Sequence, residues 1–177
     1  PTTYVAAPGV RADLQIPSES VQFFQRNTKS IPGRVMGLER NVFPGFVTLY
    51  GLEVINGANA LENRPYRQFA EAAGLVKPGE WIYDLRPADL PIWRPIADFL
   101  NVRYLAAPGN ISFPTTGYRE VATFDFKIFE SEHVWPRAFF TDRVEHYRTP
   151  ADLVTLIRNG ANRGPFAAMQ DGEPMPD

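Results

Sequence analysis

Histidine is the side chain best suited to acid–base chemistry or metal binding near neutral pH, and this chain has only two, His133 and His146. Their spacing does not place both on one helix face, as a shared metal ion would require. The stretch Glu130-Ser131-Glu132-His133 holds oxygen and nitrogen ligands that suit a metal, but a charged hairpin turn uses the same residues and is the interpretation we favour. We interpret Glu145-His146 as a solvated strand end. The sequence therefore predicts no metal site and no cofactor.

The acidic residues form no recognisable catalytic pair. Glycoside hydrolysis needs two carboxyl groups that face one sugar across about 5–10 Å. Single aspartates are scattered along the chain, among them Asp84, Asp89, Asp98, Asp125 and Asp142. The absence of cysteine excludes thiolate nucleophiles and disulfides, and the sequence has no Gly-x-Ser-x-Gly elbow or glycine-rich phosphate loop. We assign no catalytic residue, and a catalytic role for a larger parent protein stays open.

The stretch from Glu39 to Asn59 is the best candidate for a binding surface. Its candidate ligand contacts, set among several glycines, are Arg40, Asn41, Tyr50 and Asn56. Amide groups, aromatic rings and an adaptable backbone suit contact with sugars. The simpler interpretation is that the glycines allow tight turns and that the aromatic residues fill the edge of the core, namely Phe43, Phe46 and Tyr50.

Three arginines, Arg34, Arg103 and Arg137, lie in or beside predicted strands. Pairing with acids across the sheet is the role we favour for them. The alternative is that they line a pocket for an anionic ligand, because a guanidinium group binds carboxylates and phosphates in a two-pronged geometry. We keep all three among the candidate binding residues.

The composition is that of one globular domain. The 177 residues include 44% hydrophobic and 21% charged side chains, which is sufficient for a sizeable core. The net charge of −2 and the mixed signs along the chain argue against nucleic acid as a partner. No apolar run is long enough to span a bilayer, and no signal peptide is recognisable. Because the chain begins at Pro1 rather than at Met, we expect it to be a piece of a larger, membrane-anchored envelope protein.

Capping residues, turn dipeptides and hydrophobic periodicity predict an α+β domain with a mixed sheet and short flanking helices. The predicted helices begin at Ser18 and otherwise cover 63–73, 95–101 and 149–160. The predicted strands cover 34–38, 52–55, 102–106, 121–130 and 138–141, and a loop covers 109–120. Residues 161–177 are rich in proline and glycine and predict a linker or tail, which leaves 1–160 as the single folded domain.

Several short phrases occur in a characteristic order along the chain. A first group comprises Asn41-Val42-Phe43-Pro44, Tyr50-Gly51-Leu52, Asn56-Gly57 and a helix with Tyr66 and Phe69. A second group comprises Leu100-Asn101-Val102-Arg103-Tyr104-Leu105, Phe129-Glu130 and Pro136-Arg137-Ala138-Phe139. In this order, over about residues 30–160, the chain resembles the extracytoplasmic region of YfhO-like bacterial membrane proteins. These proteins are similar to multi-spanning, lipid-carrier-dependent glycosyltransferases of the GT-C type.

The resemblance implies that this domain is not itself catalytic, because the acidic catalytic residues of GT-C-like enzymes lie in loops tied to the membrane segments. It implies a role in binding a glycan or acceptor, or as a scaffold, at the periplasmic or extracellular face of the bacterial inner membrane. The implied partners are the membrane-embedded remainder of the parent chain and a glycan or lipid-linked sugar. The alternative is a free-standing carbohydrate-binding or protein-interaction module.

Overall fold

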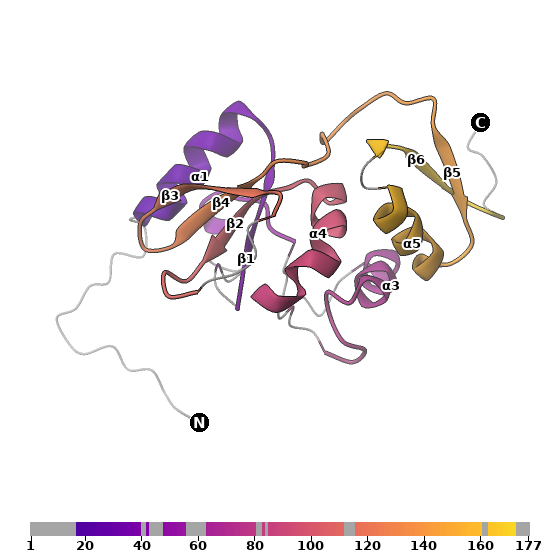
Figure 1. Ribbon diagram of the computed structural model, residues 1–177, viewed down its shortest axis with the longest axis horizontal. Helices are drawn as coiled ribbons and strands as arrows, with labels where there is room; N and C mark the ends of the chain where they lie inside the picture. Colours follow the sequence, from indigo (N-terminus) through magenta and orange to yellow (C-terminus); the bar gives the residue numbers. More distant parts are fainter. Residues whose placement is uncertain are drawn as a thin grey trace.

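A mixed four-stranded sheet forms the centre of the fold. The computed structural model describes residues 17–39, 42, 48–55, 63–80, 83, 85–111, 116–160 and 163–172. The strands, in their order across the sheet, are β1 (Arg34–Gly37), β2 (Val102–Ala107), β4 (Lys127–Ser131) and β3 (Tyr118–Thr123). β1 and β2 are parallel, whereas the other neighbours are antiparallel. This arrangement confirms the predicted α+β class with a mixed sheet (Figure 1).

Helices cover both faces of the sheet, and each face has its own hydrophobic cluster (Figure 1). The elements are α1 (Glu19–Ser30), α3 (Arg64–Ala73), a 3-10 turn (Pro87–Asp89), α4 (Leu90–Phe99) and α5 (Pro150–Gly160). On one face, α1 packs Phe24 into a cluster with Tyr104 and Ile128. On the other, α3, α4 and α5 enclose a larger cluster in which Ile96 and Leu105 are fully buried. The two faces together form the core expected of a layered domain.

A second, two-stranded sheet is built around α5. β5 (Val144–Tyr147) and β6 (Ala167–Gln170) are parallel, and α5 forms the crossover between them. Phe166, next to β6, is buried in the main cluster, where its ring centroid lies 5.2 Å from that of Trp135. The prediction of a tail from residue 161 is therefore wrong for residues 163–172, which fold onto the domain because Phe166 supplies a core side chain.

Three of the predicted helix starts, at Ser18, Asn63 and Thr149, are confirmed by their capping contacts. Ser18 and Asn63 each accept a 3.4 Å hydrogen bond from the backbone N–H three residues later. Thr149 and Asp152 exchange bonds of 2.9 and 3.2 Å between side chain and backbone at the start of α5. Gly74 ends α3 in the left-handed conformation, with a φ of 76°. None of the helices that the structure describes is long and apolar enough to cross a lipid bilayer.

Helix α4 begins earlier than predicted, at Leu90 instead of Pro95. Pro95 lies inside it, although proline normally occupies a first turn because it lacks an N–H donor. The carbonyl that loses its partner belongs to Pro91, which is itself in the first turn, so little of the helix is disturbed. Trp93 and Ile96 are both buried, and their burial outweighs the cost of an internal proline.

The predicted strand at 121–130 is wrong, since the structure divides it into β3 and β4, joined by a turn at 124–126. The carboxylate of Asp125 in this turn accepts a 3.1 Å hydrogen bond from the N–H of Ser20, at the start of α1. Polar and apolar residues go on alternating through the turn, so the pattern indicates one continuous strand. A hairpin instead places both halves in the same sheet, with β4 at its centre.

Two further predictions differ from the structure. The loop expected at 109–120 ends at Tyr118, where β3 begins. The strand expected at 138–141 is wrong, because these residues form an irregular segment that leads into β5. Phe140 in this segment is fully exposed, so its aromatic character does not reflect burial in a sheet.

A matched pair of isoleucines on α4 tests the position of the core. Ile96 is 0% exposed and Ile92 is 60% exposed. We expect Ile96→Ala to lower the free energy of unfolding by about 2–5 kcal/mol, because it removes buried methyl groups and leaves a cavity. Ile92→Ala should change it by less than about 0.5 kcal/mol. Urea unfolding of both variants checks this, and similar losses for the two would contradict the packing described here.

Candidate functional site

Two of the predicted arginines, Arg34 and Arg137, are brought together around Glu53. Arg34 Nε lies 3.6 Å from Glu53 Oε2, and Arg137 Nη1 lies 2.7 Å from Glu53 Oε1. The backbone carbonyl of Glu53 accepts a 2.8 Å hydrogen bond from Val35 N–H, beside a parallel bridge between Val35 and Val54, so this segment is extended as predicted. The hydrogen bond from Arg137 is the main cause that holds the pKa of the Glu53 carboxyl below its ordinary value.

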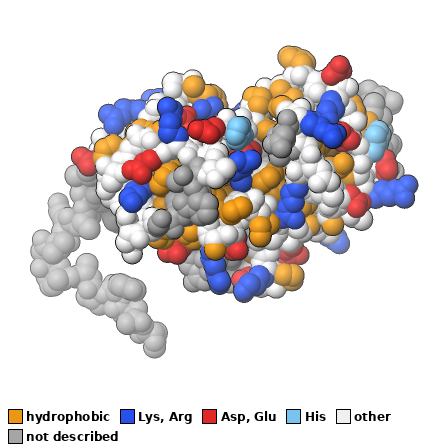
Figure 2. Space-filling model, in the orientation of Figure 1, with side chains coloured by type: hydrophobic (Ala, Val, Ile, Leu, Met, Phe, Trp, Pro, Cys, Tyr) orange, Lys and Arg blue, Asp and Glu red, His pale blue; other side chains and the backbone are white. Residues whose placement is uncertain are grey.

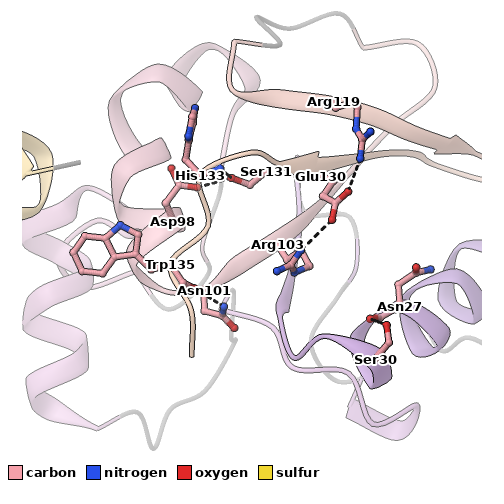
Figure 3. A network of polar contacts seen from close by, with 10 residues as sticks. All are labelled: Asn27, Ser30, Asp98, Asn101, Arg103, Arg119, Glu130, Ser131, His133 and Trp135. Carbon is pink, nitrogen blue, oxygen red and sulfur yellow. Dashed lines mark hydrogen bonds and ion pairs between the residues drawn. The ribbon is translucent and has the colours of Figure 1, made fainter. Parts of the chain in front are cut away.

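Arg103, the third predicted arginine, pairs with Glu130 on the neighbouring strand (Figure 3). Glu130 is shared: its Oε1 lies 3.0 Å from Arg103 Nη1 and its Oε2 lies 3.1 Å from Arg119 Nη2. A Cβ on Gly33 would stand 2.7 Å from Arg103 Cβ, so a side chain there would force the strand apart. All three arginines pair with acids, which is the role that we favoured for them from the sequence. Figure 2 shows basic and acidic side chains interspersed over the face that it displays.

The other predicted binding residues come from the stretch 39–59. Arg40, Asn41 and Asn56 lie outside the described residues, so their roles stay predictions. Tyr50 is described and half-buried, and it lines a groove beside α1. This groove is the candidate ligand site.

The α1 groove lies between α1 and the segment 50–52 and has a volume of about 640 Å³. Its walls are formed by Gln22, Gln25, Arg26, Thr28 and Lys29 of α1 and by Tyr50, Gly51 and Leu52. Spacings of three and four residues place Gln22, Gln25, Arg26 and Lys29 on one face of the helix. A ligand in the groove therefore meets amide, hydroxyl, guanidinium, ammonium and aromatic groups.

Local structure sets the shape of the groove wall opposite α1. Gln25 Nε2 donates a 2.9 Å hydrogen bond to the carbonyl of Tyr50, which ties the segment to the helix. Gly51 has a φ of 71°, a left-handed conformation that strains any residue with a side chain other than Asn or Asp. Leu52 is buried in the same cluster as Phe24. The groove thus has a wall anchored in the core.

A second polar cluster is buried at the end of α4, around a carboxylate of Asp98 that is only 5% exposed (Figure 3). Its Oδ1 accepts a 2.6 Å hydrogen bond from the Ser131 hydroxyl, and its Oδ2 lies 3.8 Å from Arg94 Nε. The backbone N–H of His133 donates to Ser131 Oγ at 3.2 Å. Burial raises the pKa of Asp98, while the bond from Ser131 and the charges of Arg94 and His133 act in the opposite direction.

This cluster contains the residue types of a hydrolytic site, but its side chains are not arranged as a nucleophile and its base. The Ser131 hydroxyl directs its proton to an acid that is shielded from solvent, and His133 reaches it through the backbone rather than the ring. The other histidine, His146, is exposed and lies 3.0 Å from Asp171. Across the described residues, no three His, Cys, Asp or Glu side chains are grouped so that they could hold a metal ion.

Sequence reasoning missed the importance of Asp98 and of two groove cations, Arg26 and Lys29. The sequence does give a reason to single out Asp98, because it falls on the apolar face of a helix, where a polar group is costly unless it is paired. The sequence gives no reason to single out Arg26 or Lys29, because charged residues on the outer face of an amphipathic helix are ordinary. Only the folding of 50–52 beside α1 turns that outer face into the wall of a groove.

The raised pKa of Asp98 predicts a pH dependence of stability that Asp98→Asn removes. An acid whose pKa is raised in the folded state binds its proton more tightly there, so the free energy of unfolding falls as pH rises from its ordinary value of 3.8 through the raised pKa. Asparagine keeps an oxygen for the Ser131 bond. We therefore expect the stability of the wild type, relative to this variant, to fall across that window in urea unfolding.

Asp152→Asn provides a control of opposite sign. Hydrogen bonds from Thr149 lower the pKa of Asp152, so its contribution is present above its ordinary pKa and is lost as pH falls through the lowered one. The stability of the wild type relative to Asp152→Asn should therefore rise with pH. If the difference in stability from the wild type changed with pH in the same direction for both variants, the raised pKa of Asp98 would be contradicted.

The ion pair between Arg137 and Glu53 should contribute little to stability. Their side chains are 46% and 48% exposed, so water and salt screen the two charges. A double-mutant cycle with Glu53→Gln and Arg137→Gln should give a small coupling energy that shrinks as salt is added. The same cycle on Arg103 and Glu130, which are 18% and 22% exposed, should give a larger coupling, and the reverse order would contradict this reasoning.

Comparison with known proteins leaves the assignment of function to the residues themselves. Comparisons with family models, with curated proteins and with solved structures found no match for this chain. The ground that the structure offers for a function is therefore the geometry of the α1 groove.

Proposed function

We propose that this chain is a non-catalytic, extracytoplasmic domain of a polytopic membrane protein that resembles a lipid-carrier-dependent glycosyltransferase. In this proposal the domain binds a glycan or acceptor in the α1 groove and presents it to the membrane-embedded remainder of the parent chain. It faces the periplasm or the cell exterior. The parent protein, rather than this domain, carries the transferase chemistry.

The α1 groove is the observation that carries the proposal. Its volume of about 640 Å³ falls within the range of about 300–1,000 Å³ that is usual for ligand sites. A sugar of two or three rings has hydroxyls on every side, so it needs several hydrogen-bonding groups along a groove rather than one deep pocket. Four residues of the α1 groove, Gln22, Gln25, Arg26 and Lys29, follow one face of α1 and offer such groups in a row.

The side chains of the groove match the chemistry of a saccharide. Gln22 is exposed and Gln25 is half-buried. Each donates one amide hydrogen to a backbone carbonyl, Gln22 to Pro17 at 3.0 Å and Gln25 to Tyr50 at 2.9 Å, and keeps its second N–H and its oxygen for sugar hydroxyls. The oxygen of Thr28 donates to the carbonyl of Phe24 at 2.8 Å and keeps its acceptor capacity. Tyr50 adds an aromatic ring to the wall, and its apolar face suits the C–H face of a sugar.

The α1 groove equally supports a second candidate, a free-standing carbohydrate-binding or protein-interaction module. The groove itself is the same in both proposals. They differ in the parent protein: the first requires membrane-spanning segments elsewhere in the gene product, and the second does not. The sequence of the parent gene distinguishes them, because a product without a hydrophobic span long enough for a bilayer would leave only the second.

Titration of the 177-residue chain with oligosaccharides, followed by amide chemical shifts in NMR, tests the proposed site. We expect shifts to concentrate at residues 22–29 and 50–52. Gln22→Ala should weaken binding by about two- to tenfold, because it removes one or two hydrogen bonds to the ligand. Gln68→Ala changes an exposed glutamine on α3 and should leave the affinity unchanged.

The probes for this titration are maltotriose, chitotriose and trigalacturonate. A spectrum that does not change with any of them, or shifts that lie away from the α1 groove, would overturn the proposed site. Equal effects of the two glutamine variants would show that the groove does not contact the sugar.

A further inference from the structure

Two cations of the α1 groove, Arg26 and Lys29, have no partner among the described residues, unlike the arginines identified from the sequence. Arg34, Arg103 and Arg137 all pair with acids. Within the part of the chain that the structure describes, the side chains of Arg26 and Lys29 make no ion pair and no hydrogen bond. Both are exposed and both line the groove. Their charge is therefore available to a ligand.

Nearby acids do not neutralise this charge. Glu19 lies in the first turn of α1, at the opposite end of the helix from Lys29. Glu53 follows directly after the groove residue Leu52, but its carboxylate oxygens are taken by Arg34 and Arg137. Among the described residues that line the groove, Arg26 and Lys29 are charged and none is acidic, so this part of the lining carries a net positive charge.

Capping of α1 does not account for these cations either. Basic side chains often bind the unpaired carbonyls at the end of a helix. Here the carbonyl of Asn27 accepts hydrogen bonds from Ile31 N–H at 3.2 Å and from Ser30 Oγ at 2.9 Å. The carbonyls of Phe23 and Phe24 accept additional bonds of 2.8 Å from the side chains of Asn27 and Thr28. None of these carbonyls is bound by Arg26 or Lys29.

The spacing of the two cations fits a single anionic group. Residues three apart on a helix are neighbours on its surface, so both head groups reach the same part of the groove. A guanidinium group binds a carboxylate or phosphate through two parallel hydrogen bonds, and an ammonium group adds a compact charge beside it. Gln22 and Gln25 lie on the same face and are placed to hold uncharged hydroxyls next to the anion.

We infer that the α1 groove selects an anionic saccharide, one that bears a carboxylate or a phosphate next to its hydroxyls. This inference rests on the proposed function, since it names the class of ligand for the same site. Arg26 and Lys29 bind the anion, and the glutamines and Tyr50 contact the sugar. A neutral saccharide of the same shape lacks the charged contact and binds more weakly.

Two pairs of probes, each with a charged and a neutral member, test the inference and distinguish a carboxylate ligand from a phosphate ligand. Trigalacturonate and its fully methylated ester compare a carboxylate with a neutral ester on one backbone. Glucose 1-phosphate and glucose compare a phosphate with its absence. We expect at least one charged probe to bind about tenfold or more tightly than its neutral partner, and salt to reduce this difference.

Charge-removing variants assign the preference to the two cations. Arg26→Gln and Lys29→Gln should each reduce the preference for the charged probe about fivefold or more and leave the binding of the neutral probe nearly unchanged. Arg64→Gln, at an exposed arginine of α3, is the matched control and should keep the full preference. Because all three positions are exposed, amide shift dispersion should remain that of the folded wild type.

The outcomes distinguish this inference from the proposed function on which it rests. Equal binding of charged and neutral probes at the α1 groove would overturn the inference and leave the glycan-binding function intact. A preference that survives in both Arg26→Gln and Lys29→Gln would also overturn it. If none of the probes, charged or neutral, binds in the groove, then both the inference and the proposed function fail.

Discussion

The left-handed backbone of Asn101 and the hydrogen bonds around it hold the fold together at one corner. Asn101 has a φ of 58°, which asparagine tolerates better than other residues with side chains. This turn lets α4 end and β2 begin within two residues. Its amide nitrogen donates a 2.7 Å bond to the carbonyl of Trp135, and its carbonyl accepts a 2.8 Å bond from Arg34 N–H. Asp98, one turn earlier, binds Ser131 and, through its carbonyl, the N–H of Trp135.

The same corner sets the position of the candidate site on the far side of the sheet. The bond from Arg34 to Asn101 positions the start of β1, and Val35 in β1 donates to the carbonyl of Glu53. The segment that carries Glu53 continues back to Tyr50, whose carbonyl accepts the bond from Gln25 of α1. A chain of backbone contacts therefore runs from the buried corner to the groove wall. Disturbing the corner should alter the groove without touching a groove residue.

The sequence predicted those elements whose ends carry a capping signal, and it failed where the deciding contact is distant. Three helix starts could be predicted from their N-cap residues, Ser18, Asn63 and Thr149, because a cap lies within one turn of the helix that it starts. Nothing near Pro95 indicates that α4 passes through it, because the reason is burial of the whole apolar face. The turn around Asp125 depends on α1, and β6 depends on β5, so local pattern alone assigns neither.

The sequence could predict those ion pairs of the candidate site whose two residues lie on adjacent strands. Arg103 and Glu130 lie on adjacent strands, so their pairing could be expected once both were assigned to strands. Arg26 and Lys29 differ, because they become part of a site only when a segment about two dozen residues later folds beside them. The arginines that stand out in the sequence pair with acids, so their charge is already neutralised. In the proposed site, ligand recognition depends instead on Arg26 and Lys29, which look ordinary in the sequence, because a charge without a partner beside an open groove retains interaction energy for a ligand.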